Sequence, residues 1–330
     1  MESITKNRQA PDTLRAMITR AYGPDQVPDG DGWAEELGHG WFNVAYRITL
    51  RDGTVVVLKI APPPHVEVMT YERGAMTIEL ATLRLLTERT GVPVPRVDFA
   101  DQSHDLCDAD YFFMQHIDAD NFGIVRDTLS PAERDTYNEA LGSANFQINT
   151  VSGTAFGPLA APGDATWRAC FTRMIGDVLS DGERRSVDLG HDYAAIRALI
   201  AANEDSLDEV TEPRLVEWDL WDGNVMIRDG RIVAIIDHER AFWGDPLMEA
   251  GFTAIDLPAF GDSTAFLRGY GHPALTATER RRRRLYTLYL VLIMIIETDY
   301  RGHTDTMQYD WARDRLHEVM ALFGAGREVR

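Results

Sequence analysis

Three polar side chains in the C-terminal half stand in the order that phosphoryl transfer needs. Asp219 and Asn224 lie five residues apart, and a hydrophobic hairpin leads from them to Asp237. The first carboxylate could accept the proton of an acceptor hydroxyl, and the two later oxygen ligands could hold Mg²⁺, a hard cation. Each residue alone more often belongs to an ordinary surface turn. In this order they predict Asp219 as the catalytic base and Asn224 and Asp237 as magnesium ligands.

A glycine-containing segment far upstream could bind phosphates. It carries Gly38 and Gly40, and Asn43 stands where a third glycine would complete a G-x-G-x-x-G loop. Glycines let the backbone approach phosphates closely, although such pairs more often mark a hairpin. The chain has no Walker A sequence, which excludes the P-loop class of nucleotide-binding proteins. We therefore expect Gly38, Gly40 and Asn43 to contact the nucleotide.

A lysine follows this loop on an apolar run, Val55–Lys59. An isolated strand lysine usually faces solvent. Here Lys59 precedes a helix that carries glutamates, which is the order in which kinases pair a strand lysine with a helix glutamate. We expect Glu79 to be the partner, with Glu72 as the alternative because helix phase is loosely fixed by sequence.

The apolar run Tyr111–Ile117 is expected to lead into a hinge between two lobes. Backbone groups at Gln115 and Ile117 could pair with the edge of adenine. A plain core strand is almost as good an interpretation of either residue.

Several further side chains are candidates for contact with the acceptor. Arg240 could meet a phosphate or an acidic group, although we favour a structural ion pair. Glu297 closes the apolar run Leu285–Ile296 and could face a cationic substrate, but carboxylates at helix ends usually face water. The set of candidate substrate contacts is Trp221, Asp222, Arg240, Glu297 and Tyr300.

The elements that would position these residues change in kind along the chain. A short helix is expected at 13–22, followed by strands at 33–37, 44–50 and 54–60 and a helix at 71–87. After residue 120 the pattern is helical. Capping boxes at Ser130–Glu133 and Thr276–Glu279 open two helices, the second running to about Tyr300. Between them we expect only a short hairpin around Arg228–Arg231.

This order predicts an α+β protein with two lobes. Residues 1–115 would form a small, β-rich, nucleotide-binding lobe, and residues 116–330 a larger, mainly helical lobe that carries the catalytic and substrate-binding residues. A cleft between two such lobes is a natural site for small molecules.

Composition excludes several other functions. The 330 residues include 33 Lys+Arg against 52 Asp+Glu, a net charge of −19, so a general binder of nucleic acids or anionic membranes is disfavoured. We interpret the arginine run Arg280–Arg284 as a solvated helix face. Cys107 and Cys170 lack disulfide or zinc spacing. The N-terminus lacks a signal peptide and the longest apolar run, 288–296, is too short for a membrane span, so we expect a cytoplasmic protein.

Taken together, the motifs resemble those of the aminoglycoside phosphotransferase and choline kinase superfamily over residues 33–300. The resemblance is carried by the glycine loop, Lys59, Glu79, Val92–Pro95, Met114, Asp219, Asn224, Asp237 and Gly244–Pro246. It implies a protein-kinase-like fold that binds ATP and Mg²⁺ between its lobes.

The chain departs from that family's pattern at two places. Glu217-Trp218-Asp219 stands where the family commonly has His-Gly-Asp, and Ile148-Asn149 stands where it commonly has Leu-His. The first departure affects the hydrogen bonds that support the loop, not the base itself. The surrounding residues are similar to a branch that phosphorylates nucleoside antibiotics of the capuramycin and muraymycin type.

Three functions follow from these observations. The leading one is an ATP-dependent O-phosphotransferase that inactivates an antibiotic, either a nucleoside compound or an aminoglycoside. The second is a metabolic kinase acting on choline, a sugar or an amino alcohol. A catalytically inactive nucleotide-binding regulator is disfavoured because Lys59, Asp219, Asn224 and Asp237 are all present.

Overall fold

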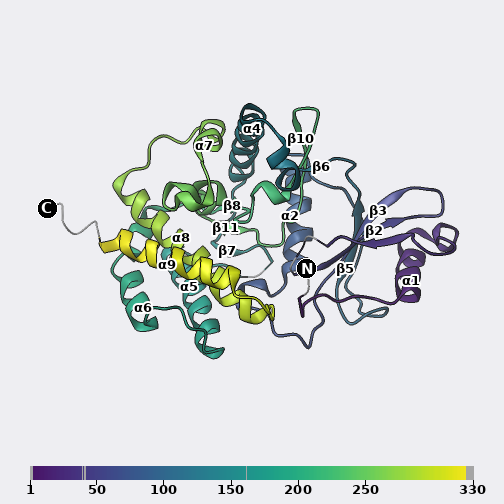
Figure 1. Cartoon of the computed structure of the whole chain (residues 1–330), viewed down its shortest axis with the longest axis horizontal. Coiled ribbons are helices and arrows are strands. Elements are labelled where there is room, and N and C mark those ends of the chain that lie inside the picture. The colour runs from purple at the N-terminus through teal and green to yellow at the C-terminus, as the bar shows by residue number, and fades with distance from the viewer. Residues whose placement is uncertain (1–2, 39, 41, 161, 325–330) are drawn as a thin grey trace. The chain divides into compact units, whose positions relative to one another are not determined.

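A computed structural model describes residues 3–38, 40, 42–160 and 162–324 (Figure 1). The chain divides into two compact units, one of residues 1–68, 95–118 and 300–303 and one of residues 69–94, 119–299 and 304–330. The sequence predicted a division at residue 115 into a nucleotide-binding lobe and a catalytic lobe. The two compact units have other bounds, and the functional division stays a prediction.

The first unit is built on a five-stranded antiparallel sheet in the order β1-β2-β3-β5-β4. Its strands are β1 (Ala34–Glu36), β2 (Val44–Thr49), β3 (Val55–Ile60), β4 (Val97–Asp101) and β5 (Tyr111–Gln115). Alternate residues of β2 are buried, so that one face of the strand points into the core. The predicted strands and the hairpin that turns at Gly53 are confirmed.

One helix contributes to the core of this sheet. Helix α1 (Pro11–Tyr22) buries Leu14, Met17 and Ile18 in the same cluster as side chains of β2, β3 and β5 (Figure 1). These positions are spaced three and one residues apart, which places them on one side of a helix.

The second unit is mainly helical. Its helices are α2 (Ala75–Arg89), α3 (Phe122–Val125), α4 (Pro131–Asn149), α5 (Trp167–Arg184), α6 (Tyr193–Ala201), α7 (Thr264–Tyr270), α8 (Ala277–Tyr300, whose last residue is grouped with the first unit) and α9 (Met307–Gly324). Short 3₁₀ helices lie at Pro24–Gln26, Thr70–Glu72, Arg126–Thr128, Glu204–Glu209, Asp222–Asn224, Pro246–Met248, Ala250–Ile255 and Pro258–Phe260. The α+β class and its β-rich and helical parts are therefore confirmed.

Local signals set the ends of these helices. Ser130 and Glu133 form the predicted capping box, and Thr276 and Glu279 form the second. Helix α2 begins at Ala75, later than expected, because Gly74 takes the left-handed conformation at φ 75° and separates it from the preceding 3₁₀ turn.

Two small sheets complete the second unit. The first has the order β10-β9-β6 and contains β6 (Asp120–Asn121), β9 (Val225–Arg228) and β10 (Arg231–Ile235). The second has the order β7-β11-β8 and contains β7 (Gly157–Pro158), β8 (Arg214–Val216) and β11 (Phe242–Gly244). The hairpin of β9 and β10 is confirmed, but the expectation that it stands alone is wrong. Strands of two or three residues are too short to show a period in the sequence.

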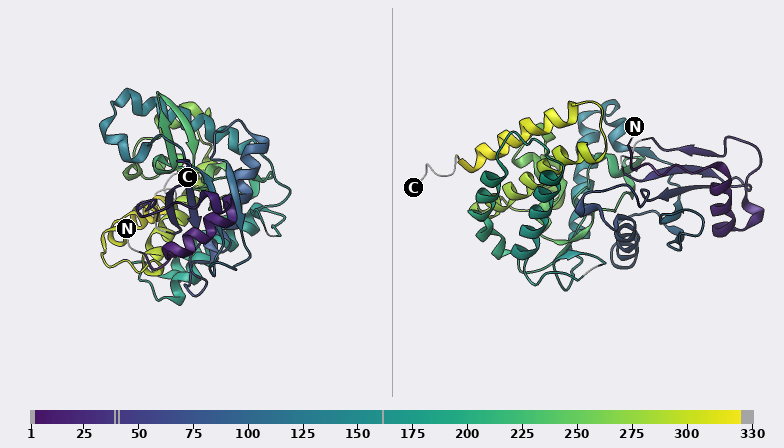
Figure 2. Two further views of the ribbon diagram at one scale, coloured as in Figure 1. Left: turned by 90° about the vertical axis from the view of Figure 1, so that its right-hand side faces the viewer. Right: turned by 90° about the horizontal axis from the view of Figure 1, so that it is seen from below.

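Aromatic side chains join α5 to α8. The ring of Phe171 lies 5.0 Å from that of Tyr286 and 5.8 Å from that of Tyr289. The run Leu285–Ile296 is largely buried, as expected for a core helix. Figure 2 shows α8 and α9, in yellow-green and yellow, beside the teal helices of the same unit. No helix in the described part of the chain is long and apolar enough to cross a membrane.

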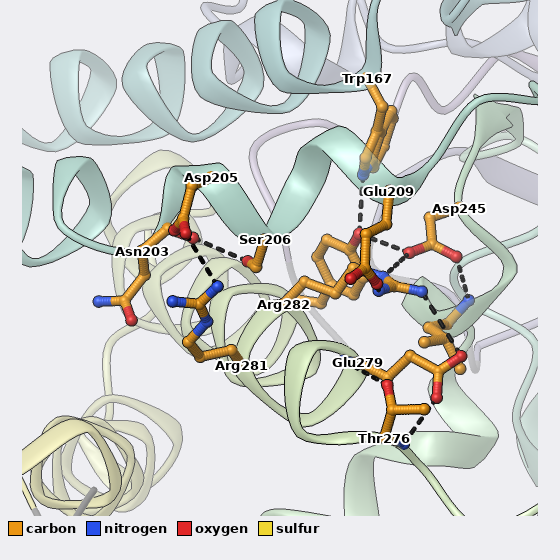
Figure 3. Close-up of polar contacts among 12 residues, drawn as sticks. Trp167, Asn203, Asp205, Ser206, Glu209, Asp245, Thr276, Glu279, Arg281 and Arg282 are labelled. Carbon is orange, nitrogen blue, oxygen red and sulfur yellow. Dashed lines mark hydrogen bonds and ion pairs between the residues drawn. The ribbon is translucent and has the colours of Figure 1, made fainter. Parts of the chain in front are cut away.

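The arginine run at the start of α8 is not the solvated face that the sequence suggested. Arg282 is 8 % exposed and Arg283 is 1 % exposed. Arg282 donates from Nε to Asp245 at 2.8 Å and from Nη1 to Glu209 at 3.0 Å (Figure 3). Tyr286 also donates to Asp245, at 2.7 Å. The interpretation as a solvated face is wrong for these two arginines because segments distant in sequence enclose the first turns of α8.

Candidate active site

The loop that carries Asp219 follows β8 and is anchored by one buried carboxylate. Glu249 accepts hydrogen bonds from the backbone N–H groups of Glu217 and Trp218, both at 3.0 Å. Asn149 donates its side-chain amide to Glu249 at 2.7 Å and accepts the hydroxyl of Tyr270 at 2.8 Å. Burial raises the pKa of Glu249 to about 7, although the hydrogen bonds from Asn149 and the loop oppose this shift. Asn149, the second departure from the family pattern, thus supports the loop of residues 217–219, which we call the base loop.

The first departure has a buried partner. Glu217 lies 2.9 Å from Nδ1 of His238, and Nε2 of His238 lies 3.0 Å from the carbonyl oxygen of Ile235. A carbonyl only accepts, so Nε2 carries a proton. Burial lowers the pKa of His238, but the Glu217 carboxylate outweighs it and leaves the pKa raised. Through its contact with Glu217, His238 joins the Asp219 loop to the segment that follows Asp237.

Asp219 itself has the properties of a base that works near neutral pH. Its side chain is 29 % exposed, and its Oδ2 lies 3.6 Å from Nε of Arg240. Burial raises the pKa of Asp219 to about 6; Arg240 opposes this shift, and the carboxylates of Asp237, Glu297 and Glu217 add to it. A carboxylate in this range can accept a proton at physiological pH.

Three carboxylates beside the base loop could bind a cation. The oxygens of Glu79, Asp237 and Glu239 all lie within 4.8 Å of one another. Such hard oxygen donors fit Mg²⁺. Glu239 was missed by the sequence reasoning, although its place two residues after Asp237 was a usable signal.

Asn224 is buried and fixed against the base loop. Its side-chain N–H donates to the backbone carbonyl oxygen of Asp219 at 2.8 Å, and its backbone carbonyl oxygen accepts from the N–H of Ile236 at 3.0 Å. With the amide nitrogen engaged, the side-chain oxygen is the group that Asn224 has to offer a metal.

Glu79 belongs to the carboxylate group just described, whereas the sequence suggested a pair with Lys59. The two residues fall in different units, so their pairing stays a prediction. The alternative partner, Glu72, accepts the backbone N–H of Met69 at 2.9 Å and closes the turn before α2.

The predicted nucleotide-binding residues Gly38, Gly40, Asn43, Lys59, Gln115 and Ile117 all belong to the first unit. The loop that carries Gly38, Gly40 and Asn43 also contains His39 and Trp41, which lie outside the described residues. Lys6 donates from Nζ to the carbonyl oxygen of Asn43 at 2.7 Å. Lys59 is buried on the central strand β3, opposite Ala45 and Phe112.

The predicted hinge residues differ in their surroundings. The backbone N–H of Gln115, at the end of β5, is bonded to the carbonyl oxygen of Arg96 at 2.9 Å. Ile117 follows the strand. The backbone N–H of Gln115 is therefore engaged, and the pairing of Gln115 and Ile117 with adenine stays a prediction.

The five candidate substrate contacts differ in their surroundings. Arg240 lies between Asp219 and Glu297, with its Nη2 3.7 Å from Glu297, so the ion pair that we favoured for it is present. Asp222 is held by Arg126 at 2.5 Å, and Trp221 beside it is 55 % exposed. Tyr300 is fully buried and belongs to the first unit.

Comparison with known proteins supports these observations. The model of the phosphotransferase enzyme family matches residues 33–286. No curated protein sequence matches at a significant level.

Solved structures share the fold of this chain. A thermostable mutant of aminoglycoside phosphotransferase APH(4)-Ia in its apo form is 18 % identical, with a TM-score of 0.65 over 96 % of this chain and 100 % of that one. A mutant of the same protein in ternary complex with AMP-PNP and hygromycin B is 19 % identical, with a TM-score of 0.66 over 95 % and 99 %. A putative fructosamine-3-kinase from Thermobifida fusca is 21 % identical, with a TM-score of 0.64 over 95 % and 100 %.

Proposed function

We propose that this chain, which belongs to the phosphotransferase enzyme family, is an ATP- and Mg²⁺-dependent kinase of small-molecule hydroxyls and that its acceptor is an antibiotic. The observation that carries the catalytic part of this proposal is the position of Asp219. It shares a hydrogen-bonded loop with Asn224, and the Glu217–His238 pair ties that loop to Asp237.

We propose the following roles in transfer. The acceptor hydroxyl gives its proton to the Asp219 carboxylate as its oxygen attacks the γ-phosphorus of ATP. The bond from that phosphorus to the β,γ-bridging oxygen breaks, and ADP leaves with the electron pair. Asn224 and Asp237, with Glu79 and Glu239 nearby, would hold Mg²⁺, which when bound neutralises charge on the phosphates.

The first unit would bind the nucleotide. Gly38, Gly40 and Asn43 would cover the phosphates, and Lys59 would pair with them. Ile117 would meet the adenine edge. The position of Lys59 on β3, paired with β2 on one side and β5 on the other, fixes the backbone from which its side chain extends.

A nucleoside antibiotic of the capuramycin or muraymycin type is the acceptor we favour. Support comes from the base loop, where Glu217 and Trp218 differ from the commoner His-Gly and have partners of their own in His238 and Glu249. An aminoglycoside is the alternative antibiotic, since the similar structures include an enzyme in complex with hygromycin B. A metabolic kinase is the second candidate function, favoured by the similarity to a putative fructosamine-3-kinase.

An acceptor screen tests this proposal. ATP consumption is measured with aminoglycosides, uridine-containing antibiotics, choline, sugars and amino alcohols, and NMR locates the phosphate on each product. We expect phosphorylation of an antibiotic hydroxyl. Turnover of choline or sugars alone would contradict an antibiotic acceptor, and tight ATP binding without turnover of any compound would favour the inactive regulator.

A further inference from the structure

A pocket of about 130 Å³ lies within the second unit, beside the proposed base. Trp218, the residue before Asp219, forms part of its wall, and Arg240 lines it while lying 3.6 Å from Asp219. A compound seated in this pocket would therefore have its neighbouring hydroxyls close to the Asp219 carboxylate.

Part of the wall is aromatic, formed by Tyr71, Trp218, Phe242 and Tyr289. The ring of Trp218 lies 5.8 Å from that of Tyr71 and 5.4 Å from that of Tyr289. The guanidinium of Arg240 lies over both Trp218 and Tyr71, at 5.3 and 5.4 Å from the ring centroids. Flat groups on several sides favour a flat ligand.

Two features show that this wall is specifically built. Trp218 has φ 60°, a left-handed conformation that a bulky residue rarely adopts, and the Glu249 carboxylate holds its backbone N–H there. The 3₁₀ turn that contains Tyr71 is fixed to α5, since Thr70 donates from its backbone and its hydroxyl to Asp181 at 2.7 and 2.8 Å.

The size of the pocket limits what it can hold. An engineered apolar cavity of about 150 Å³ accommodates one benzene molecule. A volume of about 130 Å³ therefore admits one ring, with the remainder of a larger compound outside.

The charged groups of the pocket do not suit a polycation. Its charged lining residues are three arginines and one carboxylate, Arg73, Arg173, Arg240 and Asp177. Arg240 is balanced by Asp219 and Glu297, and Arg173 by Asp164 at 2.6 Å. Asp177 is the one carboxylate among these lining residues, and it can accept a hydrogen bond.

Asp177 and Arg173 stand one turn apart on α5, with 3.8 Å between their charged atoms. Together they offer an acceptor and a donor to the edge of a ring. We propose that this pocket binds a single flat, uncharged ring of the acceptor, whose edge carries both N–H and C=O groups, and that it selects against polycationic acceptors.

This proposal rests on the proposed function and is tested first without ATP. Uridine serves as the probe because its one base is a flat ring with an N–H between two C=O groups, and hygromycin B serves as the cationic comparison. Binding to the full chain is measured by calorimetry and by saturation-transfer NMR, which reports the protons that touch the protein. We expect uridine to bind through its base protons, and hygromycin B to bind more weakly.

Two variants locate the binding. Tyr71→Ala removes part of the wall and should weaken uridine binding about tenfold, within the range found for base stacking. Asp177→Asn keeps the shape and should weaken it about fivefold through loss of a charge-assisted hydrogen bond. The controls are Phe146→Ala, an aromatic residue 50 % exposed, and Glu183→Gln on the same helix as Asp177; both should bind as the unmodified chain does.

Each outcome decides one question. Stronger binding of hygromycin B than of uridine, or equal binding by Tyr71→Ala, Asp177→Asn and their controls, would overturn the pocket assignment. Binding of uridine as expected, without phosphorylation of any acceptor in the screen, would uphold the pocket and contradict the proposed function. A thermal melt of each variant confirms that it is folded.

Discussion

At the scale of single residues, the charge on Asp219 is set by burial and by its neighbours. Arg240 favours the ionised form, while burial and the carboxylates of Asp237 and Glu297 oppose it. The result is a carboxylate that is mostly ionised at pH 7 and yet basic enough to accept a proton. An ordinary exposed aspartate would be ionised but a much weaker base.

The rate of transfer should therefore depend on pH through this group. With a pKa of about 6, Asp219 is protonated as the pH falls, and protonation removes the base. We expect kcat to drop about tenfold between pH 7 and pH 5, with a plateau above about pH 7.5. A pH–rate profile at saturating ATP measures this, with circular dichroism at each pH to verify the fold. A rate that stays constant down to pH 5 would contradict the role of Asp219.

The buried pair of Glu217 and His238 supports the site from beneath. Replacing Glu217 with Gln removes the carboxylate beside Nδ1 of His238 and weakens the link between the loop and the segment after Asp237. We expect the free energy of unfolding to fall by about 2 kcal/mol, since a buried hydrogen bond to a carboxylate is lost. Urea unfolding measures this.

Glu212→Gln is the matched control because Glu212 is exposed and pairs with Arg214 at the surface. Its free energy of unfolding should change by less than about 1 kcal/mol. Equal effects of the two replacements would show that the Glu217–His238 pair has no special importance.

At the scale of elements, the start of α8 depends on one buried arginine. Arg282 joins α8 to Asp245, at the end of β11, and to Glu209, while Arg281 beside it pairs with Asp205 at the surface (Figure 3). Arg282→Met leaves Asp245 without its cation and should lower the free energy of unfolding by about 3–5 kcal/mol. Arg281→Met should cost less than about 1 kcal/mol. A similar fall in the free energy of unfolding for both variants would show that burial does not make the ion pairs of Arg282 more important than that of Arg281.

The N-terminal segment should order the glycine loop. Lys6 is bonded to the carbonyl oxygen of Asn43, and Arg8 lies 2.7 Å from Glu36 of β1, so that both ends of the loop are held. Lys6→Met removes the hydrogen bond to Asn43. The loss of a hydrogen bond from a charged group should raise KM for ATP about tenfold, while kcat changes little. Steady-state kinetics measure both constants. Lys6→Arg should restore KM; a fall in kcat alone would contradict the role in the loop.

Elements with strong local signals were predictable from sequence. The turn at Gly53 and the capping boxes at Ser130 and Thr276 depend on residues close in the chain, and the structure contains them. The sheet β7-β11-β8 and the burial of Arg282 depend on segments tens of residues apart. No local pattern encodes such contacts, so these were missed.

The same distinction holds for the site. Asp219, Asn224 and Asp237 were singled out because their order in the chain suggests their chemistry. The residues that support them were not singled out. Glu249, for example, is a buried carboxylate 30 or more residues from the loop that it anchors. Such a role follows only from tertiary structure.

At the scale of the whole molecule, the chain has the fold of enzymes with which it shares about a fifth of its residues or fewer. A fold tolerates this divergence when hydrophobic positions and turns keep their pattern. The base loop differs in its supports, with Glu217 and His238 paired beneath it and Trp218 in the wall of the pocket. We therefore propose that different parts of one loop determine the reaction and the acceptor.

The most direct test of the central claim compares the unmodified chain with Asp219→Asn, using an acceptor that the unmodified chain phosphorylates. Single-turnover transfer of the γ-phosphate is measured alongside the affinity for ATP. We expect the transfer rate to fall by about 10²–10⁴-fold, the usual contribution of a general base, while the affinity for ATP stays within about twofold. Transfer by Asp219→Asn at a near-normal rate would contradict the assignment of Asp219 as the base.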